Sequence, residues 1–204
     1  MSAKKLALAG ILGPVLFTAL VIAQGFLLPD YSHVRLPISA LATWPTGWIQ
    51  ILNFYVFGVL TIAFAVALHR GAQPTPHGVV GVALLAISGI GIVLSGVFSW
   101  TMVDGVPTET PPHAVAAIMT FGGTALGLMV LSRRLRDDPR WRDLAMYTMC
   151  SGSIVGLLFI AVGLFAIDNA AAMHPWVGLI QRVVCAVWFA CMIVLANRLR
   201  RIST

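Results

Sequence analysis

Six long apolar runs dominate the chain, and short polar segments rich in proline separate them. The runs cover about residues 6–28, 47–68, 79–102, 114–131, 144–167 and 176–196. A helix of about 20 apolar residues crosses the roughly 30 Å hydrocarbon core of a bilayer. The pattern therefore predicts an all-α, polytopic membrane protein, with residues 1–204 forming one transmembrane domain that is a compact bundle of about six helices.

The first run contains Pro14, which bends a transmembrane helix but is tolerated in a bundle. This run is longer than the apolar core of a signal peptide, which is about 7–15 residues. We interpret it as the first span.

Composition supports a membrane protein and argues against a nucleic-acid partner. Hydrophobic residues make up 59% of the chain and charged residues only 10%, whereas soluble domains carry roughly 25% charged residues. The net charge of +6 comes from basic residues that flank the apolar runs. Topology and anionic headgroups explain such residues, so we expect membrane lipid as the partner and no nucleic acid.

The basic residues also predict the orientation, because lysine and arginine concentrate in cytoplasmic loops. If the N-terminus is cytoplasmic, 11 of the 13 basic residues lie on that side, Arg35 lies in an outer loop and Arg182 lies within the sixth run. We therefore expect both termini in the cytoplasm and a multi-pass protein of the plasma (inner) membrane. The 11 residues are Lys4, Lys5, Arg70, Arg133, Arg134, Arg136, Arg140, Arg142, Arg198, Arg200 and Arg201.

Small residues mark where helices could approach closely. Gly123 and Gly127 form one GxxxG pattern, and Gly152 and Gly156 form another. Packing within one bundle is the favoured interpretation. A second copy of the chain, or another membrane protein, remains an alternative partner for these faces.

Polar residues that could bind a ligand gather at the outer ends of the spans and in the first outer loop. Such groups are costly beside lipid and often functional. The candidate set is Arg182, Gln181, Asp104, His113, Gln50, Asn53, His33, Arg35 and Ser39.

Arg182 is the most informative of them, because it lies about 10 Å along its helix from Pro175 at 1.5 Å per residue. At that depth a guanidinium needs a polar partner or must reach back to the interface. We expect Asp104 as its partner, with Asp168 as the second choice. The alternative role is to bind a phosphate or carboxylate.

The first outer loop also predicts structure. Leu36, Ile38 and Leu41 need apolar cover, so we expect residues 37–41 to form a short helix or tight turn against the outer mouth of the bundle.

Several chemistries can be tested against the sequence. His33, His113 and His174 fall on the outer side, which suggests a zinc site, although no HxxH or HExxH spacing supports it. The only lysines are Lys4 and Lys5, so no Schiff base can form in the middle of the membrane, which argues against a retinal protein. No histidine falls in the middle of a span, which argues against a b-type haem held between helices. Walker, Rossmann and GxSxG motifs are absent, and we expect no cofactor.

The leading hypothesis is a membrane protein that binds a lipid headgroup or small anionic ligand in an outer-facing polar pocket, or that acts as an accessory subunit. One alternative is a zinc-dependent membrane hydrolase acting on lipid. The other alternative is a small transporter, which paired, interrupted helices with polar residues at mid-membrane would favour.

Several short motifs also carry a resemblance to a known family. The run from Leu36 to Leu41, LPISAL, is followed by Gly47-Trp48-Ile49-Gln50, Asn53-Phe54 and Gly58. The motifs of this region, with Gly96-Val97-Phe98, Asp104, His113 and Gly178-Leu179-Ile180-Gln181-Arg182, resemble the bacterial and archaeal membrane family called domain of unknown function 998. Members often read His-Pro-Ile-Ser where this chain has Leu36-Pro37-Ile38-Ser39. The resemblance implies a six-helix membrane protein and brings no established activity.

Overall fold

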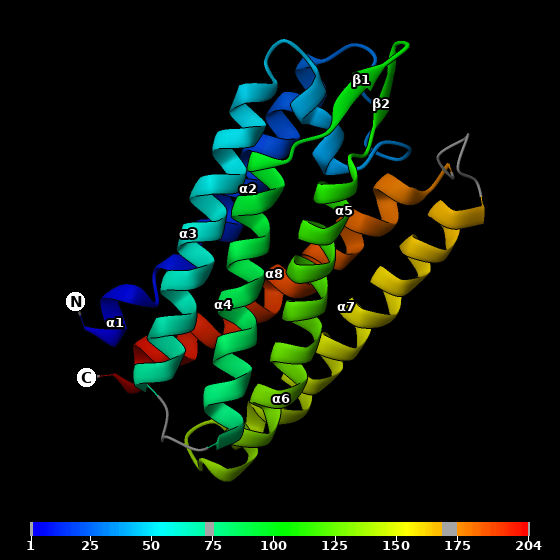
Figure 1. The fold of residues 1–204 in the computed structure, drawn as a ribbon. Helices are drawn as coiled ribbons and strands as arrows, with labels where there is room; N and C mark the ends of the chain where they lie inside the picture. Colours follow the sequence, from blue (N-terminus) through cyan, green and yellow to red (C-terminus); the bar gives the residue numbers. More distant parts are fainter. Residues whose placement is uncertain (1, 72–75, 169–174, 204) are drawn as a thin grey trace.

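Long helices make up most of the molecule, seen in a computed structural model that describes residues 2–71, 76–168 and 175–203 (Figure 1). Within these ranges six helices are long and apolar enough to cross a membrane: Ala3–Leu27, Gly47–Gly71, Gly78–Val97, Pro111–Asp137, Arg142–Gly163 and Val177–Ile202. The predicted bundle of six transmembrane helices is confirmed.

The spans are built from the following elements. The first comprises α1 (Ala3–Leu6) and α2 (Ala9–Leu27), and the second and third are α3 (Gly47–Gly71) and α4 (Pro76–Val97). The fourth joins α5 (Pro111–Ala117), a π-helical segment η2 (Ile118–Gly122) and α6 (Gly123–Asp137). The last two are α7 (Arg142–Asp168) and α8 (Val177–Ile202).

The helices form a closed bundle. Helix α3 packs on α2 and α4, α4 packs on α6, and α6 packs on α7. Helix α8 contacts both α7 and α2, and it crosses the others obliquely (Figure 1). Because α1 also contacts α8, both ends of the chain lie at one end of the bundle.

Apolar side chains remain on the outer surface of the bundle. Leu157, Ile118 and Val59 are 68%, 61% and 60% exposed. In water these side chains would be an aggregation hazard, but they match the hydrocarbon that surrounds a transmembrane helix.

The outer loop forms the predicted short helix. Residues Ile38–Thr43 adopt a 3-10 helix, η1, in which Ile38 and Leu41 are buried. The expectation for residues 37–41 is confirmed.

The third predicted span extends too far. Helix α4 ends at Val97, and the chain then forms an antiparallel hairpin of β1 (Thr101–Val103) and β2 (Val106–Thr108). Asp104 and Gly105 have φ values of 49° and 78°. Two adjacent residues with positive φ are what a type I′ hairpin turn needs, and Asp-Gly is a preferred pair for it.

Glycines set the distances between neighbouring helices. A Cβ at Gly58 would lie 2.7 Å from the Gly89 carbonyl oxygen of α4, and a Cβ at Gly89 would lie 2.9 Å from the Gly58 carbonyl oxygen. Gly123 similarly faces the Leu84 carbonyl of α4, and Gly152 faces the Ala125 carbonyl of α6. The glycine patterns therefore serve helix packing inside one chain, as favoured from sequence.

Replacing Gly89 with alanine should separate α3 from α4. The added Cβ would lie 2.6 Å from Ile62 Cγ1 as well as close to the Gly58 carbonyl, and such overpacking costs about 1–3 kcal/mol. Gly122→Ala is the matched control, because nothing lies within 4 Å of a Cβ there. Thermal unfolding in detergent should show a lower midpoint for Gly89→Ala alone, and equal midpoints would contradict the packing.

Candidate functional site

A cavity of about 690 Å³ opens inside the bundle at the end that carries the hairpin. Sites for small molecules usually measure about 300–1,000 Å³. Residues from α5, η2, α7 and α8 form its sides, and η1 and β2 lie across its outer end. Its size and position make it the candidate site.

The cavity opens sideways toward the membrane. Ile118 of η2 and Gly163 of α7 both line the cavity and are both exposed on the bundle surface. Figure 1 shows that α7 packs along α6 and then diverges from α5 toward the hairpin end. The cavity therefore reaches the bundle surface between η2 and α7, at Ile118 and Gly163.

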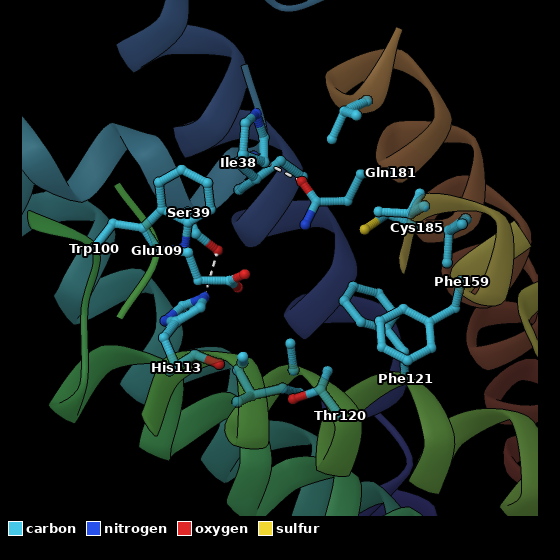
Figure 2. Close-up of a pocket in the computed structure, with 18 of the residues that line it drawn as sticks. Ile38, Ser39, Trp100, Glu109, His113, Thr120, Phe121, Phe159, Gln181 and Cys185 are labelled. Atoms are coloured by element: carbon cyan, nitrogen blue, oxygen red, sulfur yellow. Dashed lines mark hydrogen bonds between the residues drawn. The ribbon is translucent and has the colours of Figure 1, made fainter. Parts of the chain in front are cut away.

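The lining is apolar except near the hairpin. Phe121 and Phe159 stack with ring centroids 5.0 Å apart, and Phe57, Trp188 and Phe189 continue this aromatic wall. Polar side chains lie at the outer end of the cavity (Figure 2). They are those of Ser39, Trp100, Glu109, His113 and Gln181, with Thr120 deeper. Since Trp188 lies roughly 10 Å further along α8 than Gln181 at 1.5 Å per residue, the cavity has one polar and one apolar end.

His113 links three elements at the polar end. Its Nδ1 lies 2.9 Å from the Phe98 carbonyl oxygen, and its Nε2 lies 3.0 Å from Ser39 Oγ. A carbonyl can only accept, so Nδ1 carries the proton and donates it to Phe98. In the neutral ring Nε2 then accepts the hydroxyl proton of Ser39. This bond fastens η1 to α5 across the mouth of the cavity.

Gln181 fastens η1 to α8. The backbone N–H of Ile38 donates to Gln181 Oε1 over 2.7 Å. The amide nitrogen at the other end of the same side chain points into the cavity (Figure 2). Gln181 therefore offers a donor to anything bound there.

Glu109 lies at the same polar end of the cavity as Ser39 and His113 (Figure 2). Burial raises the pKa of Glu109, and the Trp100 indole N–H acts in the opposite direction. Trp100 Nε1 is itself buried. The polar end thus contains a carboxyl group whose pKa lies above its usual range, beside a buried indole N–H.

Arg182 lies outside the cavity lining and holds the outer loop. Its Nη1 donates to the Leu36 and Gly178 carbonyl oxygens over 3.1 and 2.9 Å, and its Nη2 donates to Tyr31 Oη over 2.6 Å. Tyr31 in turn donates to the Pro37 carbonyl oxygen over 3.1 Å. The predicted Asp104 partner is wrong, because Asp104 is exposed in the hairpin turn. The Asp168 side chain, the second choice, lies outside the described residues.

The remaining predicted site residues do not line the cavity. Asn53 Nδ2 donates to the Phe17 carbonyl oxygen and to Gln50 Oε1, over 3.2 and 3.4 Å, which ties α3 to α2. His33 packs on Phe26 and Tyr31, and burial, with the Arg182 charge, lowers its pKa. Arg35 is exposed. Of the nine candidates, the cavity brings together Ser39, His113 and Gln181.

The zinc hypothesis depends in part on a residue outside the described ranges, His174. Among the described residues, no group of three or more His, Cys, Asp or Glu side chains lies close enough to hold a metal ion.

Sequence reasoning missed Glu109, Trp100 and Thr120 as parts of the site. For Glu109 a signal existed, since it is an acid placed two residues before the prolines that begin the fourth span. An acid so close to lipid needs an explanation. The positions of Trp100 and Thr120 follow from the hairpin and from η2, which the apolar pattern does not reveal.

Six lipid-facing spans around a laterally open cavity define the class, a multi-pass integral membrane protein. A family model described as "Protein of unknown function (DUF998)" matches residues 11–198, and the chain belongs to that family. No curated protein and no solved structure matches it.

Removing the guanidinium of Arg182 should loosen the outer loop. Hydrogen bonds to charged groups contribute about 1.5–3 kcal/mol, so Arg182→Met should lower the free energy of unfolding by about that amount or more. Tyr31→Phe should be non-additive with it, because Tyr31 Oη is one of the partners. A double-mutant cycle of thermal unfolding in detergent measures the coupling.

Arg35→Met is the control for this cycle, because Arg35 is an exposed arginine of the same loop. Its effect should stay within about 0.5 kcal/mol. Additive effects of Arg182→Met and Tyr31→Phe would contradict the described contact.

Proposed function

We propose that the protein binds one amphiphilic lipid molecule in the cavity, with its chain among the aromatic residues and its polar end beside Ser39, Glu109, His113 and Gln181. The observation that carries the proposal is the polarity of the cavity, polar at the hairpin end and apolar toward the centre of the bundle. A lipid in a bilayer has the same polarity along its length. The exposed edges of the cavity at Ile118 and Gly163 let such a molecule enter from the membrane.

The lining favours an uncharged polar group over the anionic one expected from sequence. Among the described residues, those that line the cavity include Glu109 but neither lysine nor arginine. Arg182, which was the reason to expect an anion, donates to Leu36, Gly178 and Tyr31 instead. A phosphate at the polar end would be buried without a compensating cation among these residues. Hydroxyl or ester groups can use the donors and acceptors that are present.

We also infer the orientation proposed from the basic residues. The ends of the chain and the loop at 138–141 lie at the end of the bundle opposite the hairpin (Figure 1). The segments of that end contain 11 of the 13 basic residues. This end faces the cytoplasm of a plasma (inner) membrane by the positive-inside rule, and the cavity opens into the outer leaflet.

Cysteine accessibility tests the orientation. A single cysteine placed at Asp104, in a background without Cys150, Cys185 and Cys191, should react with a membrane-impermeant maleimide in intact cells. A cysteine at Arg140 in the same background should react only after the cells are opened. The reverse pattern would overturn the orientation.

Filling the cavity should abolish lipid binding. Ala114 lines the cavity, and its neighbour Val115 is 58% exposed on the outer surface. Ala114→Phe should weaken binding of a fluorescent monoalkylglycerol ether at least tenfold, whereas Val115→Phe, the matched control, should leave it unchanged. Fluorescence anisotropy on the purified chain in detergent measures both.

The charge of the competitor tests the headgroup. An unlabelled monoalkylglycerol should displace the probe. Its phosphorylated counterpart should need an at least tenfold higher concentration to displace the same fraction of the probe. Equal loss of binding in both phenylalanine variants, or no binding by the wild type, would overturn the proposal.

A further inference from the structure

We propose that Ser39 and His113 act as nucleophile and general base in the cleavage of an acyl ester held in the cavity. The inference rests on the proposed function and deepens it, because it makes the bound lipid a substrate. Ser39 Oγ lies 3.0 Å from His113 Nε2, and both residues line the cavity.

The hydrogen-bond chain gives the histidine the tautomer that a base needs. His113 Nδ1 donates to the Phe98 carbonyl oxygen over 2.9 Å, which leaves the lone pair of Nε2 directed at the serine hydroxyl. A base whose second nitrogen is oriented by a third group is the usual arrangement for activating a serine. Here the orienting group is a backbone carbonyl at the end of α4.

Donors for a developing oxyanion lie around the same pair. The Gln181 amide nitrogen points into the cavity (Figure 2), and the Trp100 indole N–H is a second buried donor at the polar end. Such donors stabilise a tetrahedral intermediate when they are already in place. Glu109 lies at the same polar end of the cavity.

The depth of the pair in the membrane fits an ester. His113 lies in the first turn of α5, where the fourth span begins, and the aromatic wall lies further in. The ester bonds of acyl lipids lie at the same boundary between headgroups and hydrocarbon. A chain lying along Phe121 and Phe159 would place its carbonyl carbon near Ser39.

The reaction balances without a redox partner. Ser39 Oγ attacks the ester carbonyl carbon and gives its proton to His113 Nε2. The bond from that carbon to the alcohol oxygen breaks, and the alcohol leaves with the proton from Nε2. Water then attacks the acyl-serine, His113 takes its proton and returns it to Ser39 Oγ, and a carboxylic acid is released.

A reactive probe separates this role from a purely structural hydrogen bond between η1 and α5. The full chain in detergent is treated with a long-chain alkyl fluorophosphonate, which forms a phosphorus–oxygen bond to an activated serine and releases fluoride. We expect one adduct per chain, located at Ser39 by peptide mass spectrometry. Hydrolysis of a long-chain acyl nitrophenyl ester is measured on the same samples.

Three variants complete the experiment. Ser39→Ala removes the nucleophile, and His113→Asn removes the base but keeps an amide that can donate to Phe98. Both should lose the adduct and lower ester hydrolysis at least about 100-fold, the scale of general-base catalysis. Ser132→Ala, the control, alters a buried serine of α6 outside the cavity whose hydroxyl donates to Met129, and it should keep both signals.

Binding of the non-hydrolysable monoalkylglycerol ether distinguishes the two proposals. If the fluorophosphonate does not modify the wild type, but the wild type still binds the ether, the inference is overturned and the proposed function is left intact. A wild type labelled at Ser39 that binds no ether would overturn the proposed lipid instead. An adduct that persists in Ser39→Ala, or full labelling of a folded His113→Asn variant, would also overturn the Ser39–His113 pair.

Discussion

The need to satisfy polar backbone groups beside lipid governs the outer half of this protein. The loop between α2 and α3 is not helical up to η1, and loop carbonyl and N–H groups near hydrocarbon require partners from the protein. Arg182 and Gln181, adjacent on α8, supply them by binding Leu36 and Ile38. Gly178 helps, because a Cβ there would lie 2.9 Å from the His33 carbonyl oxygen. One turn of α8 thus holds the loop against the bundle.

The position of that loop determines the shape of the cavity. Because η1 is tied to α8 through Gln181 and to α5 through the Ser39–His113 bond, it crosses the space between these helices. Without it, the polar end would open freely to water. With it in place, and among the described residues, the cavity still reaches the bundle surface at Ile118 and Gly163. The same contacts that stabilise the loop therefore cover the polar end of the cavity.

The sequence predicted the parts of this architecture that depend on apolar length. Six runs long enough to span a bilayer became six helices, and buried Leu41 explains why η1 packs against the bundle. The hairpin was missed because Met102 and Val103 extend the apolar run of α4, although Asp104-Gly105 is a strong turn signal. The π-helical segment at Ile118–Gly122 has no comparable signature, since it depends on the packing of α4 and α7 around it.

The site was predicted less well, because a residue's outer position says little about the direction of its side chain. Ser39, His113 and Gln181 point into one cavity, whereas Gln50 and Asn53 point between α3 and α2. Arg182 was expected to have a polar partner, with Asp104 as the first choice. Three oxygen acceptors serve it instead, two of them backbone carbonyls that no residue type encodes.

Leu36 shows why the departure from the family motif leaves this framework intact. The first motif often has histidine where this chain has leucine, so any function of that side chain would be lost here. The interaction that holds the loop, however, uses the carbonyl oxygen of Leu36 and the N–H of Ile38. Backbone groups are the same whichever side chain they carry. What the motif must preserve is the conformation that Pro37 favours, with φ of −65°, and the hydroxyl of Ser39 that follows it into the cavity.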